Sequence, residues 1–236
     1  MNALPQAFAV IPAAGVGRRM GSQIPKQYLP LAGSTVMEHT LRRFLMYPRI
    51  QAIVVAISAT DSWWPQCTFA NHPQMLIADG GSERCHSVLN ALHKLREFAA
   101  DDAWVLVHDA VRPCLRSEDL DQLFEKLATS SIGGLLGVPV RDTMKRIDAN
   151  NAVQATVSRT NLWHAYTPQM FRFNLLYQAL NQAMQQNLVV TDEAEAIELA
   201  GYQPVMVAGH ADNLKITRQE DLALAEFFIG LHNANS

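Results

Sequence analysis

The sequence predicts an α/β protein with a Rossmann-like, mostly parallel sheet, helices on both faces and an inserted β-arm. Short apolar runs alternate with longer stretches of helical periodicity, which is the pattern of βαβ units. Several of these runs are continuous, as in strands covered by helices on both faces. The chain has 236 residues, of which 49% are hydrophobic, so it can form one substantial core. We therefore expect a single domain over residues 1–236.

The individual elements follow from the same periodicities. The apolar runs predict strands at Ala7–Pro12, Ala52–Ser58, Met75–Ala78, Trp104–Val107, Gly134–Val138 and Gln203–Val207. The helical patterns lie at Val36–Tyr47, Glu83–Phe98, Glu118–Ser130, Phe173–Gln186, Asp192–Ala200 and Glu220–Ile229. Thr217 and Glu220 have the spacing of a capping box, which predicts how the last helix begins.

One segment interrupts the alternation of strands and helices. Arg141–Ile147 and Ala152–Arg159 are polar, contain β-branched residues and flank the turn-forming residues 148–151. This pattern predicts a protruding hairpin, the β-arm at about 141–160. A hairpin with so few core residues is marginally stable alone, so the arm should pack on something. We expect a homodimer formed through the arm.

The composition excludes several classes of protein. A formal net charge of -3 gives no general attraction for nucleic acid or for an anionic membrane, so we expect neither partner. No apolar run approaches the ~20 residues that span a bilayer, and no basic segment precedes Phe8–Ala14. The three cysteines form no C-x-x-C pair, which favours free thiols in a reducing cytoplasm.

The segment after the first strand combines small residues with positive charge. Small residues let backbone N–H groups approach a phosphate closely, and nearby cations supply the charge that a triphosphate needs. A dinucleotide fingerprint would require a small residue at Met20, and the Gly-Lys-Ser/Thr of a P-loop is absent. The alternative is an ordinary turn with solvated arginines. The small residues are Ala13, Ala14, Gly15 and Gly17, and the cations are Arg18, Arg19 and Lys26.

Two further motifs follow predicted strands. Asp79–Arg84 is a glycine-rich turn that can surround a flat base, although a helix entry with Ser82 as N-cap is the simpler interpretation. His108–Pro113 follows Trp104–Val107 at the ligand-binding edge of the predicted sheet. A carboxylate such as Asp109 can hold Mg²⁺ between phosphates there. Alternatively, Asp109 and Arg112 form a structural pair.

The motifs together resemble a known family. Ala13–Lys26 resembles the G-x-G-x-R…P-K signature of nucleotidyltransferases that activate sugars and sugar alcohols. The whole chain resembles the 2-C-methyl-D-erythritol 4-phosphate cytidylyltransferase family. The matching stretches, in order, are Pro12–Lys26, Asp79–Ser87, His108–Pro113, Pro139–Arg146, Trp163–Gln169, Thr191–Ala194 and Ala211–Thr217.

The resemblance implies a function. The expected enzyme transfers CMP from CTP to the polyol phosphate 2-C-methyl-D-erythritol 4-phosphate and releases pyrophosphate, in non-mevalonate isoprenoid synthesis. It implies a Mg²⁺ cofactor and an arm that reaches the neighbouring subunit's site. Ser82 stands where many relatives carry Asp.

The resemblance also implies the roles of individual residues. Charge stabilisation at the reacting phosphate falls to Arg19, Lys26 and Lys215. The nucleotide is assigned to Ala13, Ala14, Gly15, Gly17, Gly81, Ser82 and Ser87, and the acceptor to Asp109, Arg112, Thr143, Arg159 and Thr167, with Asp109 also near the metal.

Two alternatives remain open from the residues themselves. The first keeps the chemistry and changes the acceptor, above all to ribitol 5-phosphate. The second is a catalytically silent nucleotide-binding module, against which Arg19, Lys26, Asp109 and Lys215 are all present. A general base such as His108 is unnecessary, because the attacking phosphate monoester is already ionised.

Overall fold

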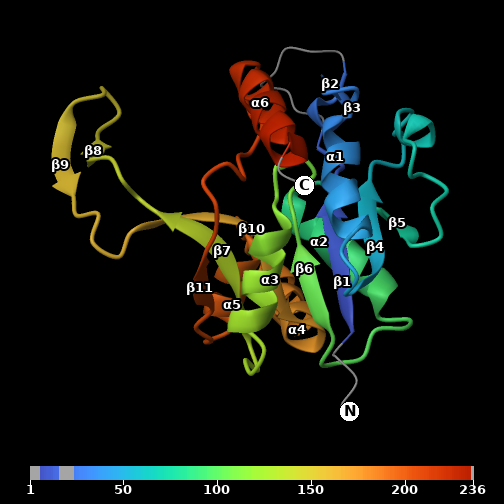
Figure 1. The fold of residues 1–236 in the computed structure, drawn as a ribbon. Helices are drawn as coiled ribbons and strands as arrows, with labels where there is room; N and C mark the ends of the chain where they lie inside the picture. The colour runs from blue at the N-terminus through green and yellow to red at the C-terminus, as the bar shows by residue number, and fades with distance from the viewer. Residues whose placement is uncertain (1–5, 16–23, 235–236) are drawn as a thin grey trace.

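The computed structural model describes residues 6–15 and 24–234, and a seven-stranded sheet forms its centre (Figure 1). The strand order is β11-β7-β10-β6-β1-β4-β5, and every neighbouring pair is parallel except those of β10. The prediction of a mostly parallel sheet is confirmed. The strands are β1 (Ala7–Pro12), β4 (Ile50–Ile57), β5 (Met75–Asp79), β6 (Trp104–Val107), β7 (Gly133–Pro139), β10 (Trp163–Arg172) and β11 (Val205–Ala208).

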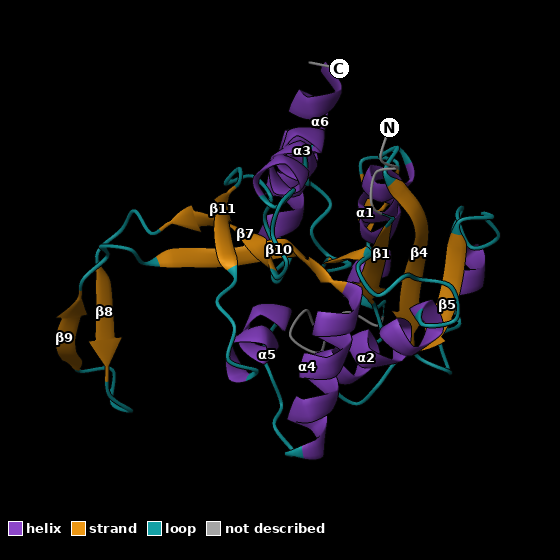
Figure 2. Cartoon of the chain, turned by 90° about the horizontal axis from the view of Figure 1, so that it is seen from below, coloured by secondary structure: helices purple, strands orange, loops and turns teal. Residues whose placement is uncertain are grey.

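Helices cover both faces of the sheet (Figure 2). One face carries α1 (Val36–Leu45) and α3 (Ser117–Lys126). The other carries α2 (Arg84–Leu95), α4 (Phe173–Gln185) and α5 (Glu193–Leu199). Within the described ranges, none of the helices has the length and apolar character that a membrane span requires.

Strand β1 shows why two helical layers form. Its alternate residues point to opposite faces, so Ile11 belongs to the core under α1, while Phe8 and Val10 belong to the core under α2. All three side chains are buried. A strand that is apolar on both sides needs cover on both sides, which the helices supply.

The last helix, α6 (Glu220–Ala234), packs on a third, smaller apolar cluster. The expected capping box between Thr217 and Glu220 does not form. Asp221, not Glu220, accepts hydrogen bonds from the backbone N–H and the hydroxyl of Thr217. The helix already begins at Glu220, so Thr217 lies too far ahead to be its N-cap.

Strand β10 was not expected. It lies between β6 and β7 and pairs antiparallel with both. Short elements complete the body, namely β2 (Pro30–Leu31), β3 (Ser34–Thr35) and two single-turn helices, η2 (Lys26–Tyr28) and η3 (Trp64–Gln66).

The predicted hairpin is confirmed as an arm inserted between β7 and β10. Its strands, β8 (Met144–Ile147) and β9 (Val153–Val157), pair only with each other and extend away from the body (Figures 1 and 2). All but the last of the strand residues are exposed. A two-stranded ribbon of this kind gains little stability from its own core.

Candidate functional site

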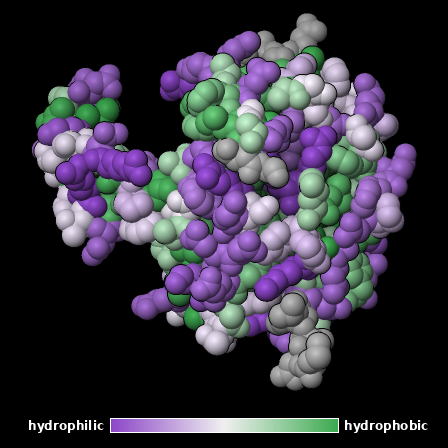
Figure 3. Space-filling model, in the orientation of Figure 1, coloured by the Kyte–Doolittle hydropathy of each residue, from purple (hydrophilic) through white to green (hydrophobic). Residues whose placement is uncertain are grey.

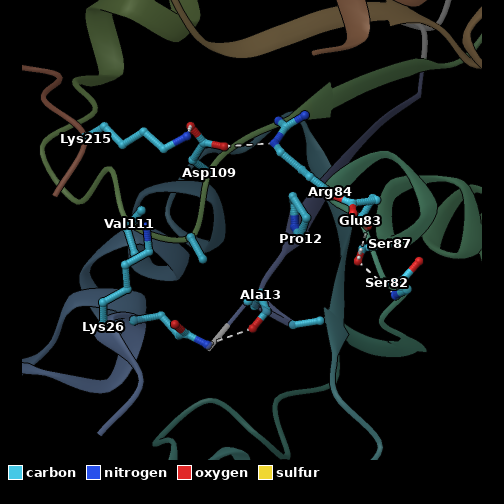
Figure 4. Close-up of a pocket in the computed structure, with 15 residues that line it drawn as sticks. Pro12, Ala13, Lys26, Ser82, Glu83, Arg84, Ser87, Asp109, Val111 and Lys215 are labelled. Atoms are coloured by element: carbon cyan, nitrogen blue, oxygen red, sulfur yellow. Dashed lines mark hydrogen bonds and ion pairs between the residues drawn. The ribbon is translucent and has the colours of Figure 1, made fainter. Parts of the chain in front are cut away.

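A cavity of about 310 Å³ lies where the parallel strands β1, β5 and β6 end (Figure 4). The ends of parallel strands are where open α/β sheets bind ligands. Segments far apart in the sequence meet there, including η2 and the stretch before α6. The lining residues are Pro12, Ala13, Ala14, Gly15, Lys26, Gln27, Gly81, Ser82, Glu83, Arg84, Ser87, Asp109, Ala110, Val111 and Lys215.

The loop after β1 is held at its start. The N–H of Ala13 donates to the carbonyl of Ala56 at 2.8 Å, and the buried side-chain amide of Gln27 donates to the carbonyl of Ala13 at 2.8 Å. The second contact fixes η2, and with it Lys26, against this loop. Gln27 was not assigned a role from the sequence. The predicted site residues Gly17 and Arg19 lie outside the described residues.

The glycine-rich turn after β5 forms the opposite wall. A side chain on Gly80 would collide with Ala14, because an added Cβ would lie 2.1 Å from the Ala14 Cβ. The N–H of Gly81 donates to the Ser87 hydroxyl at 2.9 Å, and this hydroxyl contacts the carbonyl of Glu83 at 3.2 Å. The two loops that line the cavity are therefore packed against each other.

Ser82 does not cap helix α2. The N-cap is Glu83, and the exposed Ser82 hydroxyl instead contacts His86 Nδ1 at 2.9 Å. The simpler interpretation of this turn, with Ser82 as N-cap, is wrong. Ser82 lines the cavity and is exposed.

Asp109 is the most heavily paired carboxylate of the cavity. Its Oδ1 lies 3.1 Å from Arg84 Nε, and its Oδ2 lies 3.2 Å from Arg112 Nε and 3.0 Å from Lys215 Nζ. Burial raises the pKa of this carboxyl, but the attraction of Arg84, Lys215 and Arg112 outweighs burial and lowers its pKa well below the ordinary range. Asp109 is therefore ionised at neutral pH.

Arg84 is the main residue that the sequence did not assign. Besides Asp109, its guanidinium contacts the buried carboxylate of Glu193 in the first turn of α5. A signal existed in the sequence, because Arg84 begins α2 and a cation at a helix N-terminus opposes the helix dipole. The structure thereby gives the buried Glu193 carboxylate a charged partner.

Arg112 and Thr167 lie behind Asp109 and do not line the cavity themselves. Both side chains are buried. The N–H of Asp109 donates to the Thr167 hydroxyl at 3.1 Å, and the Arg112 guanidinium lies over the ring of Tyr166, 4.7 Å from its centroid. Both predicted acceptor residues thus contact the predicted site through Asp109.

Thr143 and Arg159 are not brought to this cavity within one chain. Thr143 precedes β8 and Arg159 follows β9, and both are exposed. Arg159 Nη1 donates to the carbonyl of Arg141, which joins the two sides of the arm at its base. In Figure 1 the arm extends away from the strand ends that form the cavity.

The donor set suits a cation that phosphates share. Between residues 6–15 and 24–234, no group of three His, Cys, Asp or Glu side chains could hold a metal ion alone. Among the residues that the structure describes, Asp109 Oδ1 accepts a single hydrogen bond, from Arg84 Nε, which leaves it further acceptor capacity. Mg²⁺ commonly binds one or two carboxylates and completes its shell with substrate phosphates and water.

The arrangement can bind and neutralise a polyphosphate. Lys26, Lys215 and Arg84 all line one cavity whose walls are tight, small-residue loops. These three cations outnumber the two carboxylates of the lining, Glu83 and Asp109. Such a site stabilises negative charge on phosphorus oxygens, which is the main requirement of phosphoryl-type transfer.

Comparison with known proteins gives matches over nearly the whole chain. The family model IspD, described as 2-C-methyl-D-erythritol 4-phosphate cytidylyltransferase, matches residues 7–231. A Pseudomonas putida (strain GB-1) protein of that name is 53% identical over 223 residues, covering 94% of this chain and 95% of the relative. An Escherichia coli O9:H4 (strain HS) protein of that name is 49% identical over 231 residues, covering 97% and 96%.

Solved structures share the fold. The Francisella tularensis 2-C-methyl-D-erythritol 4-phosphate cytidylyltransferase (IspD) superposes with a TM-score of 0.84 at 37% identity, covering 94% of this chain and 99% of that chain. A 4-diphosphocytidyl-2C-methyl-D-erythritol synthase superposes with a TM-score of 0.83 at 37% identity, covering 97% and 100%.

Proposed function

The chain belongs to the 2-C-methyl-D-erythritol 4-phosphate cytidylyltransferase family, and from this premise we propose how its cavity performs the reaction. The enzyme transfers CMP from CTP to 2-C-methyl-D-erythritol 4-phosphate in the non-mevalonate route to isoprenoid precursors. The products are 4-diphosphocytidyl-2-C-methyl-D-erythritol and pyrophosphate. The observation that carries the proposed mechanism is the convergence of Lys26, Lys215 and Asp109 on one cavity.

CTP occupies the cavity between the two packed loops. Backbone groups at Ala13, Ala14 and Gly15 face the triphosphate, and Gly17 and Arg19 continue the same loop in the sequence. The base lies at the turn of Gly81, Ser82 and Ser87. The turn is ordered before CTP arrives, because Ser87 already holds the N–H of Gly81.

The acceptor reacts through its phosphate. One phosphate oxygen attacks the α-phosphorus of CTP in line, the new phosphorus–oxygen bond forms, and the bond to the β-phosphate oxygen breaks. Pyrophosphate leaves with the electron pair of that bond. Lys26, Lys215 and Arg19 neutralise the charge that develops at the α-phosphate. No general base is required, since the attacking oxygen is already ionised.

Mg²⁺ is the proposed cofactor. Asp109 Oδ1, with the phosphate oxygens of CTP, forms a donor set that suits this hard cation. When bound, the ion would neutralise charge on the triphosphate. Asp109 itself is held in place for this role by Arg84, Arg112 and Lys215.

The active form is a homodimer, and it works in the cytoplasm. The arm exposes Met144, Ile147 and Val153, apolar side chains that one chain leaves uncovered (Figure 3 shows green residues on the arm). The arm of one subunit delivers Thr143 and Arg159 to the acceptor site of the other. The cytoplasmic proposal is supported by the free, buried state of Cys67, Cys85 and Cys114, which suits a reducing compartment.

The experiment mixes purified protein with Mg²⁺, CTP and one polyol phosphate at a time, and follows pyrophosphate release. We expect release with 2-C-methyl-D-erythritol 4-phosphate and little with ribitol 5-phosphate. Omitting Mg²⁺ should abolish release. Unchanged release in the presence of excess chelator would contradict the proposed cofactor, and exclusively monomeric protein at micromolar concentration in equilibrium sedimentation would contradict the proposed dimer.

A further inference from the structure

A second cavity, of about 420 Å³, is lined by residues of η2, the β2–β3 hairpin, the first turn of α1 and the segment around η3. It shares no lining residue with the cavity of the proposed reaction. The single-turn helix η2 contributes to both, because Lys26 and Gln27 line the first cavity and Tyr28 lines the second. A volume in this range suits a small molecule.

Two aromatic side chains supply much of the apolar surface of the second cavity. The rings of Tyr28 and Trp63 are nearly parallel, with 6.2 Å between their centroids and 23° between their planes. Tyr28 is buried, whereas Trp63 is only half-buried, so part of the indole is left uncovered. The faces of phenol and indole rings attract cations, and indole does so most strongly.

The carboxylate of Glu38 gives this cavity negative charge. It lines the cavity, it is buried, and the groups that donate hydrogen bonds to it are neutral. The donors are the hydroxyl of Ser34 at 2.7 Å, the N–H and hydroxyl of Thr35 at 2.9 and 3.0 Å, and the N–H of Thr68 at 2.7 Å.

Among the described residues, no cation balances this carboxylate. No lysine, arginine or histidine of residues 6–15 and 24–234 forms an ion pair with Glu38, and none lines the second cavity. Arg42, one turn further along α1, lies over the ring of Phe69 instead. Burial raises the pKa of Glu38, but hydrogen bonds from Thr68 and Ser34 outweigh burial and lower the pKa to about 2. A buried, ionised group without a counter-charge favours a ligand that brings the opposite charge.

The hydroxyl groups beside this carboxylate act as acceptors towards the cavity. Backbone N–H groups of Thr35 and Thr68 donate to its two oxygens, which fixes both oxygens as acceptors. The hydroxyls of Ser34 and Thr35 must therefore give their hydrogens to the carboxylate. Ser34 is half-buried and lines the cavity, so its oxygen has acceptor capacity left for a ligand. Tyr28 likewise donates its hydroxyl hydrogen to Asp61, at 2.9 Å.

We propose that the second cavity is a binding site for a small organic molecule that carries a primary ammonium group on an apolar body. The ammonium group donates to the hydroxyl oxygen of Ser34, and the carboxylate of Glu38 balances its charge. The apolar body packs on the rings of Trp63 and Tyr28. The capping box of α1 explains why Glu38 contacts Thr35, but that role requires neither the aromatic rings nor the cavity.

Isothermal titration calorimetry of the full chain with phenethylammonium tests the site. This probe joins a primary ammonium group to an aromatic body, and phenethyl alcohol has the same body without the charge. We expect phenethylammonium to bind in the millimolar range or more tightly, and phenethyl alcohol to bind about tenfold more weakly. Equal affinities for the two compounds, or no binding of phenethylammonium at ~10 mM, would overturn the proposal.

Two substitutions test the residues that hold the ligand. Trp63→Ala removes the more exposed ring and Glu38→Gln removes the charge, and each should weaken phenethylammonium binding about tenfold. The control is Phe227→Ala, which removes an exposed ring outside the cavity and should change the affinity by less than about twofold. Circular dichroism shows whether each variant is folded. Because Trp63 is only half-buried, its variant decides the test if Glu38→Gln does not fold, and an unchanged affinity in Trp63→Ala would rule out the site.

Two measurements on the unaltered protein show where the probe binds. Saturating CTP should change the affinity for phenethylammonium by less than about twofold, because the two cavities share no lining residue. Direct competition between them would place the probe in the first cavity and contradict the proposal. In nitrogen-15 spectra of tryptophan-labelled protein, phenethylammonium should shift the indole resonance of Trp63, assigned by its loss in Trp63→Phe, more than those of Trp104 and Trp163. An unshifted Trp63 resonance at saturation would refute the assignment.

Discussion

The guanidinium of Arg84 binds the carboxylate of Glu193 in a bidentate manner, with Nη1–Oε1 at 2.6 Å and Nη2–Oε2 at 3.1 Å. The third nitrogen, Nε, contacts Asp109 Oδ1 at 3.1 Å. A single arginine thus joins the first turns of α2 and α5 to the carboxylate of the cavity. The planar fork of arginine suits this geometry, which lysine cannot reproduce.

Glu193→Gln should destabilise the protein by about 3 kcal/mol, because breaking one side of a buried ion pair leaves the other charge under-compensated. Urea unfolding followed by circular dichroism measures this change. The matched control is Glu198→Gln on the exposed face of the same helix, which should change stability by less than about 0.5 kcal/mol. Equal midpoints for the two variants would contradict the expectation.

Lys26→Ala should reduce turnover by ~10²-fold or more, which is the scale seen when one preorganised charge stabiliser is removed. The fold should persist, because Lys26 lies at the cavity and is not part of the buried core. Initial rates at saturating CTP and acceptor measure the effect. Lys94→Ala on α2 is the control, and its rate should match that of the unaltered enzyme. A Lys26 variant with near-normal turnover would remove this residue from the mechanism.

A mixture of Lys26→Ala and Arg159→Ala subunits should regain activity that neither variant has alone. In a mixed dimer, the intact arm of the first subunit meets the intact cavity of the second, so one of the two sites is complete. Random pairing of equal amounts gives roughly a quarter of normal activity. Co-expression with two different tags supplies the mixed dimers.

The control for this experiment is a second substitution in the same arm. Lys145→Ala changes an exposed lysine of β8 and should leave activity unchanged. If the co-expressed mixture stays as inactive as its components, Arg159 acts within its own subunit or not at all, and the proposed exchange of arms is wrong.

Gly80→Ala should raise KM for CTP about tenfold, because its methyl group would occupy the space of the Ala14 side chain and displace the loop after β1. Adding Ala14→Gly should restore part of the affinity. Recovery should be incomplete, since the carbonyl of Ile57 also lies 3.0 Å from the added Cβ. Gly230→Ala on α6, where no atom lies within 4 Å of an added Cβ, should not change KM.

Glu38→Gln should make the free energy of unfolding depend less on pH in the acid range. Burial raises the pKa of Glu38, but hydrogen bonds from the N–H of Thr68 and the hydroxyl of Ser34 outweigh it and lower the pKa from 4.5 to about 2. A lowered folded-state pKa means that the ionised group stabilises the fold above pH 4.5 and that this stabilisation is lost as the pH falls towards 2.

The expected contribution of Glu38 at neutral pH is on the order of 2 kcal/mol. Chemical unfolding at a series of pH values measures it. The exposed Glu97 provides the control, because Glu97→Gln removes a carboxylate whose ion pair with Lys94 is solvated. If Glu38→Gln showed the same pH dependence as that control, the hydrogen bonds to Glu38 would not stabilise the fold.

Strands buried on both faces could be predicted from the sequence almost to the residue. β1 and β6 begin and end where their apolar runs do, because burial on two sides leaves no room for polar residues. β10 could not be predicted in this way. It mixes polar with apolar residues and contains Pro168, which interrupts the usual strand pattern.

The site was predictable where one short segment supplies it, and not where distant segments meet. Ala13, Gly81 and Asp109 each follow a strand that the sequence reveals. The contact of Arg84 with Glu193 joins residues 109 positions apart, and no local pattern specifies such a partner. It depends on how α2 and α5 pack on the same face of the sheet.

The arm leaves the sheet at Pro139 and returns at Trp163, and these two residues are paired in register on neighbouring strands. Neighbouring strands lie only ~4.8 Å apart, so the inserted segment begins and ends at nearly the same point. An insertion with adjacent ends can be lengthened, shortened or exchanged while every strand pairing of the body is retained. The body can therefore keep its sheet while the arm changes, and because the proposed function places Thr143 and Arg159 of the arm at the partner's acceptor site, such changes would act on the acceptor and leave the CTP cavity as it is.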